Sequence, residues 1–219
     1  MKWLSRSGAV AALAVGGATV WGAGWRGFGL LLAFFVSGSL LTTMAEGGGG
    51  RRTAAQVFAN GGVAAVAALA GWWPIFAGAL AAATADTWAT EIGAFSPTPP
   101  RLITSGVPVP RGASGGITPL GTAGGVLGAA VMGGLSWVLG PRAGGPGSTH
   151  PGWTAAVVAG AGVVGMLVDS LLGATVQGAF GDEPVQPRRG YAWLDNDGVN
   201  LAATLAGAGI ATAGWRLCC

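Results

Sequence analysis

The few carboxylates of this sequence are concentrated where apolar segments end. Of eight acidic residues, Asp86, Glu91, Asp169 and Asp195 fall within or at the ends of apolar runs, and Asp197 follows closely. Charged side chains near hydrocarbon are energetically costly, so they are rare and usually functional. Carboxylates are also the side chains that hold Mg²⁺, commonly one or two of them together with phosphate oxygens and water. These positions therefore indicate a metal and phosphate site.

A glycine-rich segment supplies a second part of such a site. The run Gly112-Ala113-Ser114-Gly115-Gly116-Ile117-Thr118 precedes an apolar stretch, and Arg111 stands directly before it. Glycines allow successive backbone N–H groups to converge on an anion, and the N-terminus of a following helix adds its positive dipole end. The planar guanidinium group of arginine suits phosphate oxygens. The segment therefore indicates an anion cradle, with a flexible interhelical turn as the alternative.

Other polar residues recur at helical spacing. Asp86 and Thr90 are four residues apart and share one face of a helix, whereas Glu91 lies about 140° round from Asp86. The same spacing relates two further sets of polar residues, which are Arg52, Gln56 and Asn60, and Asn196 and Asn200. With the predicted helix that ends near Asp169, four predicted helices would thus place their polar ends in one layer.

The overall composition is that of a membrane protein. Charged residues make up 9% of the 219 residues, hydrophobic residues make up 51%, and the mean hydropathy is +0.58. Soluble proteins average about 25% charged residues. Lys2 is the only lysine, which excludes a phosphate-binding loop that ends in Gly-Lys. His150, Cys218 and Cys219 cannot build an ordinary structural zinc site. The net charge of +3 comes from scattered arginines, so we expect no nucleic-acid partner.

Apolar segments long enough for a bilayer core of about 30 Å predict an all-α polytopic membrane helix bundle. We expect about seven transmembrane helices, at residues 7–21, 27–44, 53–71, 73–93, 117–139, 152–177 and 196–215. The break between the third and the fourth depends on Trp72, Trp73 and Pro74, which look like an interfacial aromatic turn. Without that turn, residues 61–85 would be one apolar run and the count would fall to six. Residues 1–219 are expected to form a single integral-membrane domain with Gly/Pro-rich cytoplasmic loops.

The basic residues predict the orientation. In the seven-span arrangement, eight of the 11 Lys and Arg residues fall on the side of the N-terminus, as the positive-inside rule requires of the cytoplasmic side. We therefore expect a cytoplasmic N-terminus, an external C-terminus and a site on the cytoplasmic face of a bacterial-type inner or plasma membrane. A cleaved signal peptide in residues 1–24 is the competing interpretation.

Several of these segments, taken in order, resemble a known family. They are Ser5-Arg6-Ser7-Gly8-Ala9, Arg52-x-x-x-Gln56-Val57-x-Ala59-Asn60-Gly61, Ala85-Asp86-Thr87-Trp88-Ala89-Thr90-Glu91-Ile92-Gly93, Val107-Pro108 with Gly115-Gly116-Ile117-Thr118, Asp169-Ser170-Leu171-Leu172-Gly173-Ala174-x-x-Gln177, and Asn196-Asp197-x-Val199-Asn200. Together they resemble the integral-membrane phytyl-phosphate kinase family, formerly a family of unknown function. More distantly, they are similar to polyprenol kinases and CTP-dependent phosphatidate cytidylyltransferases. The resemblance covers nearly the whole chain.

This resemblance implies a membrane kinase. Its expected reaction is phosphoryl transfer from a nucleoside triphosphate, with CTP the expected donor, to an isoprenyl monophosphate such as phytyl or geranylgeranyl phosphate. The product is then the isoprenyl diphosphate. Such a transfer requires mainly positioning and charge neutralisation. The expected partners are therefore these two substrates and membrane lipid, with Mg²⁺ as the cofactor.

The expected roles follow from that reaction. Asp86, Glu91 and Asp169 are the predicted Mg²⁺ ligands and, with Arg111, the predicted catalytic residues. The predicted substrate- and nucleotide-binding residues are Arg52, Gln56, Asn60, Thr87, Thr90, Gly112, Ser114, Gly115, Gly116, Thr118, Gln177, Arg188, Arg189, Asn196, Asp197 and Asn200. Ala113 and Ser114 stand where the family usually has a small hydroxyl residue and then Asp or Asn, so the backbone is expected to form the cradle.

Three alternatives stay open at this point. The carboxylates could pair with arginines purely to hold helices together. The chain could be a membrane carrier for an anionic or phosphorylated solute, although carriers usually bind near the midplane between internal repeats. It could also be a CTP-dependent cytidylyltransferase, which would release pyrophosphate instead of a nucleoside diphosphate. The sequence also leaves open whether the chain forms a homodimer.

Overall fold

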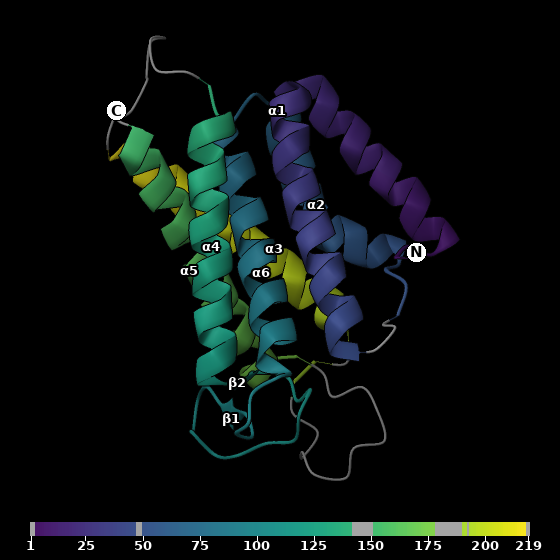
Figure 1. Ribbon diagram of the computed structural model, residues 1–219, viewed down its shortest axis with the longest axis vertical. Helices are drawn as coiled ribbons and strands as arrows, with labels where there is room; N and C mark the ends of the chain where they lie inside the picture. The colour runs from purple at the N-terminus through teal and green to yellow at the C-terminus, as the bar shows by residue number, and fades with distance from the viewer. Residues whose placement is uncertain (1–2, 47–49, 142–150, 178–189, 192, 218–219) are drawn as a thin grey trace.

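The protein is a bundle of helices with two very short strands, which confirms the predicted all-α membrane helix bundle (Figure 1). The computed structural model describes residues 3–46, 50–141, 151–177, 190–191 and 193–217. Its elements are α1 (Arg6–Glu46), α2 (Ala54–Leu69), α3 (Trp73–Gly93), β1 (Arg101–Leu102), β2 (Gly116–Ile117), α4 (Pro119–Leu139), α5 (Pro151–Thr175) and α6 (Asn196–Arg216).

Helix α1 contains two of the predicted spans. Gly24 has φ 66° and ψ −170°, a conformation that is not helical and that favours glycine. The chain folds back there, and Figure 1 shows the first half of α1 leaning away from the second half. The predicted break at the Trp72-Trp73-Pro74 turn is also present, because α2 ends at Leu69 and α3 begins at Trp73. Each of the seven predicted spans therefore has a helical counterpart.

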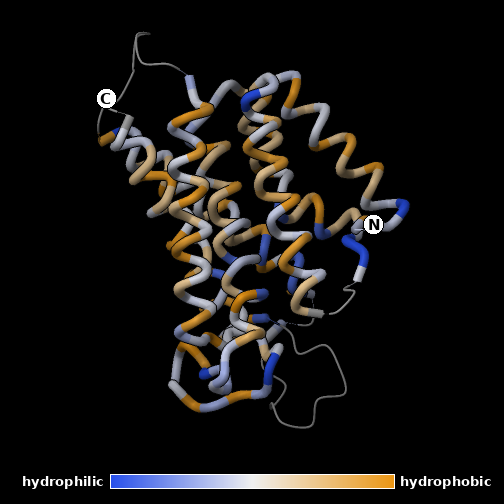
Figure 2. Tube along the Cα trace, in the orientation of Figure 1, coloured by the Kyte–Doolittle hydropathy of each residue, from blue (hydrophilic) through white to orange (hydrophobic). Residues whose placement is uncertain are grey.

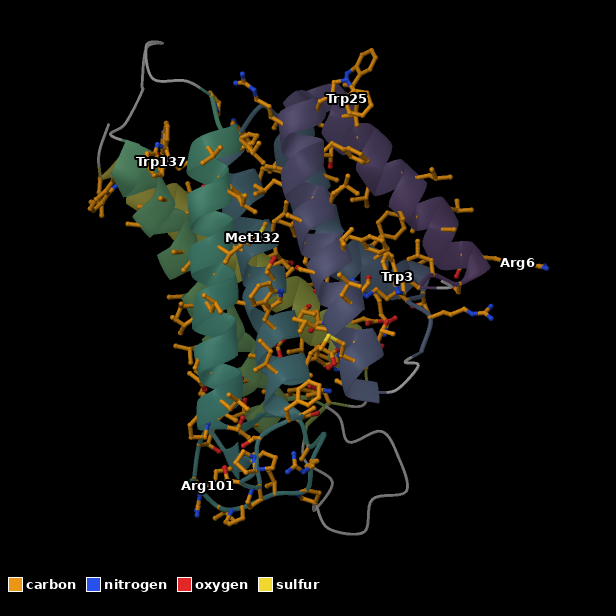
Figure 3. All side chains as sticks on the ribbon, viewed as in Figure 1. Trp3, Arg6, Trp25, Arg101, Met132 and Trp137 are labelled. Atoms are coloured by element: carbon orange, nitrogen blue, oxygen red, sulfur yellow. The ribbon has the colours of Figure 1, made fainter. Side chains whose placement is uncertain are left out.

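By length and composition, three of the described helical segments can cross a membrane. They are Arg6–Ala45, Pro119–Leu139 and Gly152–Thr175. Helix α2 is shorter, since its 16 residues extend only roughly 24 Å. Exposed tryptophans, among them Trp25 and Trp137, project at the end of the bundle where α4 finishes, and Arg101 lies at the opposite end (Figure 3). Tryptophan is typical of membrane interfaces.

Helix α3 is the central helix of the bundle. Its residues from Phe76 to Ala85 are all buried, and it packs against each of the other five helices. Small residues make this close packing possible, as at Gly121 of α4, where an added Cβ would lie 2.5 Å from the Ala89 carbonyl oxygen. Gly125 approaches the Ala85 carbonyl oxygen in a similar way. The small residues of α4 thus allow it to pack closely against α3.

The segment between α3 and α4 is folded against the end of the bundle. Strands β1 and β2 pair antiparallel, with Arg101 opposite Ile117 and Leu102 opposite Gly116. The Ile103 N–H donates to the Gly115 carbonyl at 3.0 Å. The hydrophilic residues of the chain lie largely in this half of the molecule (Figure 2). This segment, residues 94–118, closes the polar end of the bundle, and we call it the hairpin segment.

Candidate active site

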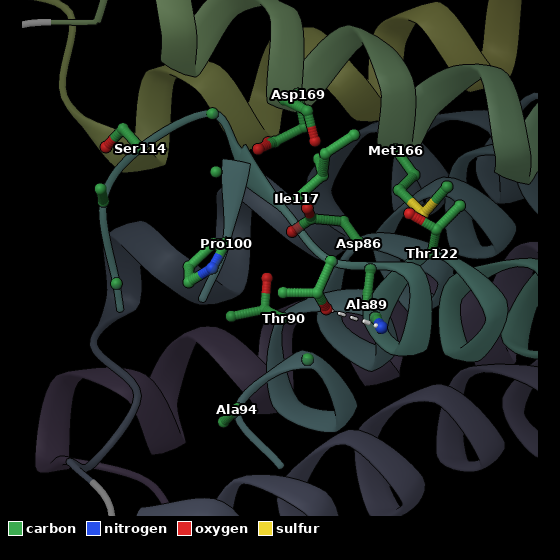
Figure 4. A pocket seen from close by; sticks show the side chains of 18 of the residues that line it. Asp86, Ala89, Thr90, Ala94, Pro100, Ser114, Ile117, Thr122, Met166 and Asp169 are labelled. Atoms are coloured by element: carbon green, nitrogen blue, oxygen red, sulfur yellow. Dashed lines mark hydrogen bonds between the residues drawn. The ribbon is translucent and has the colours of Figure 1, made fainter. Parts of the chain in front are cut away.

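A cavity of about 360 Å³ lies where the end of α3, the start of α4 and the later turns of α5 meet beneath the hairpin segment. Among the residues that line it are Asp86 and Thr90 from α3, Thr122 from α4, Asp169 from α5, and Ser114 from the glycine-rich loop (Figure 4). Three helices and a loop that are distant in the sequence thus bring polar groups into one space.

Asp86 and Asp169 form a carboxylate pair in this cavity. The two carboxyl groups point toward each other in Figure 4 and lie within hydrogen-bonding reach. One oxygen of Asp169, Oδ2, is buried and has no hydrogen-bond partner among the described residues. A buried carboxylate oxygen without a partner is unfavourable unless a cation or a donor satisfies it. The pair therefore fits Mg²⁺, which is commonly bound through one or two carboxylates.

Glu91 faces a different neighbour. Its Oε1 accepts a hydrogen bond from the Thr42 hydroxyl of α1 at 2.6 Å. Glu91 contributes to the lining of the cavity, yet the described residues contain no group of three His, Cys, Asp or Glu side chains arranged to hold a metal. The structure thus gives a carboxylate pair instead of the predicted trio. Binding of Mg²⁺ to that pair stays a prediction.

Arg52 and Thr87 lie on the same side as Glu91, outside the cavity lining. The Arg52 guanidinium group stacks at 5.8 Å from the centroid of Phe34 and 5.7 Å from that of Phe35. An added Cβ at Gly38 would lie 3.0 Å from Arg52 Nη2 and 3.1 Å from the Thr87 methyl carbon, so these two side chains meet beside α1. The predicted phosphate contact of Arg52 is therefore separated from the carboxylate pair.

The glycine-rich loop has the backbone form expected of an anion cradle. Gly112 and Gly115 have φ values of 84° and 76°. The Ala113 and Gly116 N–H groups donate within the loop, to the carbonyls of Pro110 and Ala113. The N–H groups of Gly112, Ser114 and Gly115 donate to no acceptor among the described residues. Three backbone donors of the loop thus have no described acceptor, and anion-binding loops use donors of this kind.

Helix α4 begins directly behind this loop. Thr118 is its N-cap, and the Thr118 hydroxyl oxygen accepts the Gly121 N–H at 2.9 Å. Thr118, Gly121 and Thr122 all line the cavity, so the positive end of the α4 dipole borders it. The position of the loop also depends on α5, because an added Cβ at Gly115 would collide with the Cβ of Ala174.

Arg111 lines the cavity, but its guanidinium group has backbone partners. Nη1 donates to the Ala94 carbonyl at 2.8 Å, and Nη2 donates to the Ser96 carbonyl at 2.6 Å. These carbonyls follow the end of α3. Arg111 therefore joins the glycine-rich loop to the helix that carries Asp86, and two of its guanidinium nitrogens bind carbonyls. Its contact with a triphosphate stays a prediction.

Of the residues predicted as ligands, twelve line the cavity. They are Asp86, Thr90, Glu91, Arg111, Gly112, Ser114, Gly115, Gly116, Thr118, Asp169, Gln177 and Asn196. The described residues predicted as ligands that do not line it are Arg52, Gln56, Asn60, Thr87, Asp197 and Asn200. Arg188 and Arg189 lie outside the described residues.

Two of the predicted ligands on α2 form local hydrogen bonds. Gln56 belongs to a capping box with Thr53, in which the Thr53 N–H donates to Gln56 Oε1 at 3.0 Å and the Gln56 N–H donates to Thr53 Oγ1 at 3.4 Å. Asn60 Nδ2 donates to the Gln56 carbonyl at 3.0 Å. The predicted ligand stripe on α2 is thus occupied by contacts that stabilise the start of this helix.

Sequence reasoning missed two hydroxyl groups of the cavity. Thr122 and Ser170 line it, and neither side chain forms a hydrogen bond with a described residue. Thr122 follows Thr118 by one helical turn, and Ser170 follows Asp169 directly. Helical periodicity from Thr118 was a signal that could have found Thr122.

Comparison with known proteins places the chain in a family. Residues 1–208 match the family described as integral membrane protein DUF92. One relative, "Uncharacterized membrane protein MJ0933" of Methanocaldococcus jannaschii, is 32% identical over 94% of this chain and 83% of its own length. Another, "Protein PGR" of Arabidopsis thaliana, is 31% identical over 84% of this chain and 79% of its own length. No solved structure matches. The chain belongs to the DUF92 family of integral membrane proteins.

Proposed function

We propose that this membrane protein is a phosphotransferase that converts an isoprenyl monophosphate to its diphosphate. The phosphoryl donor is a nucleoside triphosphate, and CTP is the donor that we propose. One observation supports this above the others. The Asp86–Asp169 pair, with its unpartnered buried oxygen, shares a cavity with a glycine-rich loop whose backbone donors are free of described acceptors. A cation site beside an anion site is what phosphoryl transfer requires.

The loop and the start of α4 hold the donor phosphates in this proposal. The N–H groups of Gly112, Ser114 and Gly115 donate to phosphate oxygens, and the N-terminus of α4 adds a positive potential. The hydroxyls of Thr90 and Thr122 border the same space and orient the phosphates. Gln177 and Asn196, at the end of α5 and the start of α6, bind at the rim.

Asp86 and Asp169 hold Mg²⁺ in this proposal. When bound, Mg²⁺ neutralises charge on the donor phosphates. The acceptor is an anion at neutral pH, so the chain needs no general base. An oxygen of the acceptor phosphate bonds to the terminal phosphorus of the donor, the bond from that phosphorus to its bridging oxygen breaks, and the nucleoside diphosphate leaves. The residues of the cavity thus act by placing the two phosphates in line.

The test is a product assay on the purified protein in lipid nanodiscs. The protein is incubated with CTP, Mg²⁺ and geranylgeranyl or phytyl phosphate, and nucleotides and lipids are separated. We expect CDP and the isoprenyl diphosphate in equal amounts, and loss of both products when EDTA is present. Pyrophosphate in place of CDP would identify a cytidylyltransferase. Uptake of a phosphorylated solute into sealed vesicles, with no nucleotide consumed, would identify a carrier.

A further inference from the structure

A second cavity, of about 850 Å³, runs along the outer face of α4 beneath the hairpin segment. Its walls on α4 are mainly small or apolar, and the hairpin covers one end. The residues that line it are Arg101, Leu102, Ile103, Gly106, Ile117, Thr118, Pro119, Thr122, Ala123, Val126, Leu127 and Ala130. We call this cavity the α4 groove.

The α4 groove adjoins the candidate active site. Ile117, Thr118 and Thr122 line both cavities, so the two cavities share a wall. Thr118 is buried, and Thr122 is half-buried, one turn along the helix. The groove therefore lies directly against the candidate active site at this end.

The groove is polar only at that shared end. Arg101, Thr118 and Thr122 lie near the hairpin, whereas Val126, Leu127 and Ala130 continue the groove along α4. Arg101 Nη1 donates to the Gly106 carbonyl at 2.8 Å, and Arg101 lies at the hairpin end of the bundle (Figure 3). A bilayer lipid packed at random along α4 would need no such distribution. An amphiphile with one anionic end matches it, since its charge would lie by Arg101 and its chain along the apolar walls.

We propose that the α4 groove binds the hydrocarbon chain of the lipid phosphate whose head group enters the candidate active site, with the far part of the chain at Ala130. This inference rests on the proposed function for the identity of the head group. From Ala123 to Ala130 the groove extends two helical turns, or roughly 10 Å. A tryptophan at Ala123 would fill the groove near the head group, and a tryptophan at Ala130 would fill only its far part.

The first test compares chain lengths in three tryptophan variants. We expect Ala130→Trp to lower kcat/KM for geranylgeranyl phosphate by at least about tenfold and to leave a short isoprenyl monophosphate nearly unaffected. Ala123→Trp should impair both substrates. Val131→Trp is the matched control, because Val131 is exposed on the same helix and does not line the groove. If Ala130→Trp, like Val131→Trp, changes kcat/KM by the same factor for every chain length, the groove does not hold the chain.

The second test does not need turnover. A geranylgeranyl phosphate with a photoreactive group at the end of its chain is cross-linked to the wild-type protein in nanodiscs, and the labelled peptide is identified. We expect labelling within residues 119–130 that unlabelled geranylgeranyl phosphate suppresses. Such labelling without phosphoryl transfer would support the groove and refute the proposed kinase. Phosphoryl transfer with the label on another helix, or labelling that only bulk phospholipid suppresses, would overturn the groove proposal.

Discussion

The last turns of α3 carry carboxylates on two faces, and the surrounding protein gives them different partners. Asp86 faces Asp169 across the cavity, and the pair leaves Asp169 Oδ2 buried without a hydrogen bond from any described residue. Glu91, five residues later, accepts a hydrogen bond from Thr42 on α1 and lies within coulombic range of Arg52. The fold itself therefore stabilises Glu91, whereas the Asp86–Asp169 pair is suited to a ligand. Within two turns of one helix, one carboxylate thus has a partner in the fold, whereas the other belongs to the pair that we propose to be catalytic.

The largest effect should come from removing one charge of the pair. We expect Asp86→Asn or Asp169→Asn to lower phosphoryl transfer by roughly 100-fold or more, because the pair loses one of the two carboxylates proposed to hold Mg²⁺ against the donor phosphates. The thermal unfolding temperature should hold or rise, since asparagine has nearly the same size and is less costly to bury than a carboxyl group that can ionise. Both quantities are measurable on detergent-purified protein, by product assay and by fluorescence-detected unfolding.

Asp195→Asn is the control for these two variants. Asp195 is the N-cap of α6, where its side chain accepts the Gly198 N–H at 2.9 Å, and asparagine caps helices equally well. It also does not line the cavity. This variant should keep wild-type turnover. Near-normal turnover in Asp86→Asn would instead show that the cavity face of α3 is no more catalytic than the face toward α1.

The second prediction concerns the loop that lies opposite the carboxylate pair. Gly115→Ala should impair both folding of the loop and nucleotide binding. Its positive φ costs an alanine about 1–2 kcal/mol, and its Cβ would collide with Ala174 of α5, which adds about 1–3 kcal/mol. Gly112→Ala has the same strain but meets nothing within 4 Å. We therefore expect the KM for CTP to rise more in Gly115→Ala than in Gly112→Ala, and equal effects would show that contact with α5 does not position the cradle.

The third prediction tests the face toward α1. Thr42→Val removes the bond to Glu91 and should destabilise the protein by about 1.5–3 kcal/mol, the range for a hydrogen bond to a charged group. Glu91→Gln keeps an acceptor oxygen and weakens the same bond by removing the charge. The double variant should therefore lose less than the sum of the two. Turnover per folded molecule should fall far less than in Asp86→Asn. If Glu91→Gln instead abolished turnover while the protein stayed folded, Glu91 would act with the pair, as the sequence had predicted.

These contrasts show which features sequence reasoning could reach. The apolar spans, the turn at Trp72-Trp73-Pro74 and the shared face of Asp86 and Thr90 follow from local periodicity, and the structure confirms the helices and places both side chains in the cavity. The bond between Glu91 and Thr42 joins residues 49 positions apart, so no local pattern indicates it.

Two other assignments show why local patterns mislead. The Thr53-x-x-Gln56 capping box was visible in the sequence, but the four-residue spacing of polar residues favoured a ligand stripe instead. The acceptors of Arg111 are backbone carbonyls, which every residue has, so no side-chain type marks them in the sequence. A polar residue can therefore be placed near a site from sequence, while its partner is found only in three dimensions.

The smallest expected effect is that of Arg111→Lys, and it distinguishes a positioning residue from a phosphate ligand. Lysine keeps the charge but cannot bind the Ala94 and Ser96 carbonyls together in the planar geometry of arginine. The link between the glycine-rich loop and the end of α3 then loosens, which should weaken both substrates because the cavity is formed between these two segments. We expect the KM values for CTP and for the isoprenyl phosphate to rise together, by about five- to tenfold, which corresponds to the loss of roughly one hydrogen bond. Arg6→Lys, at an exposed position with no role in the cavity, is the matched control. A rise in the KM for CTP alone would mean that Arg111 leaves its carbonyl partners and binds the triphosphate directly, and the loop would then recognise the donor by a side chain as well as by its backbone.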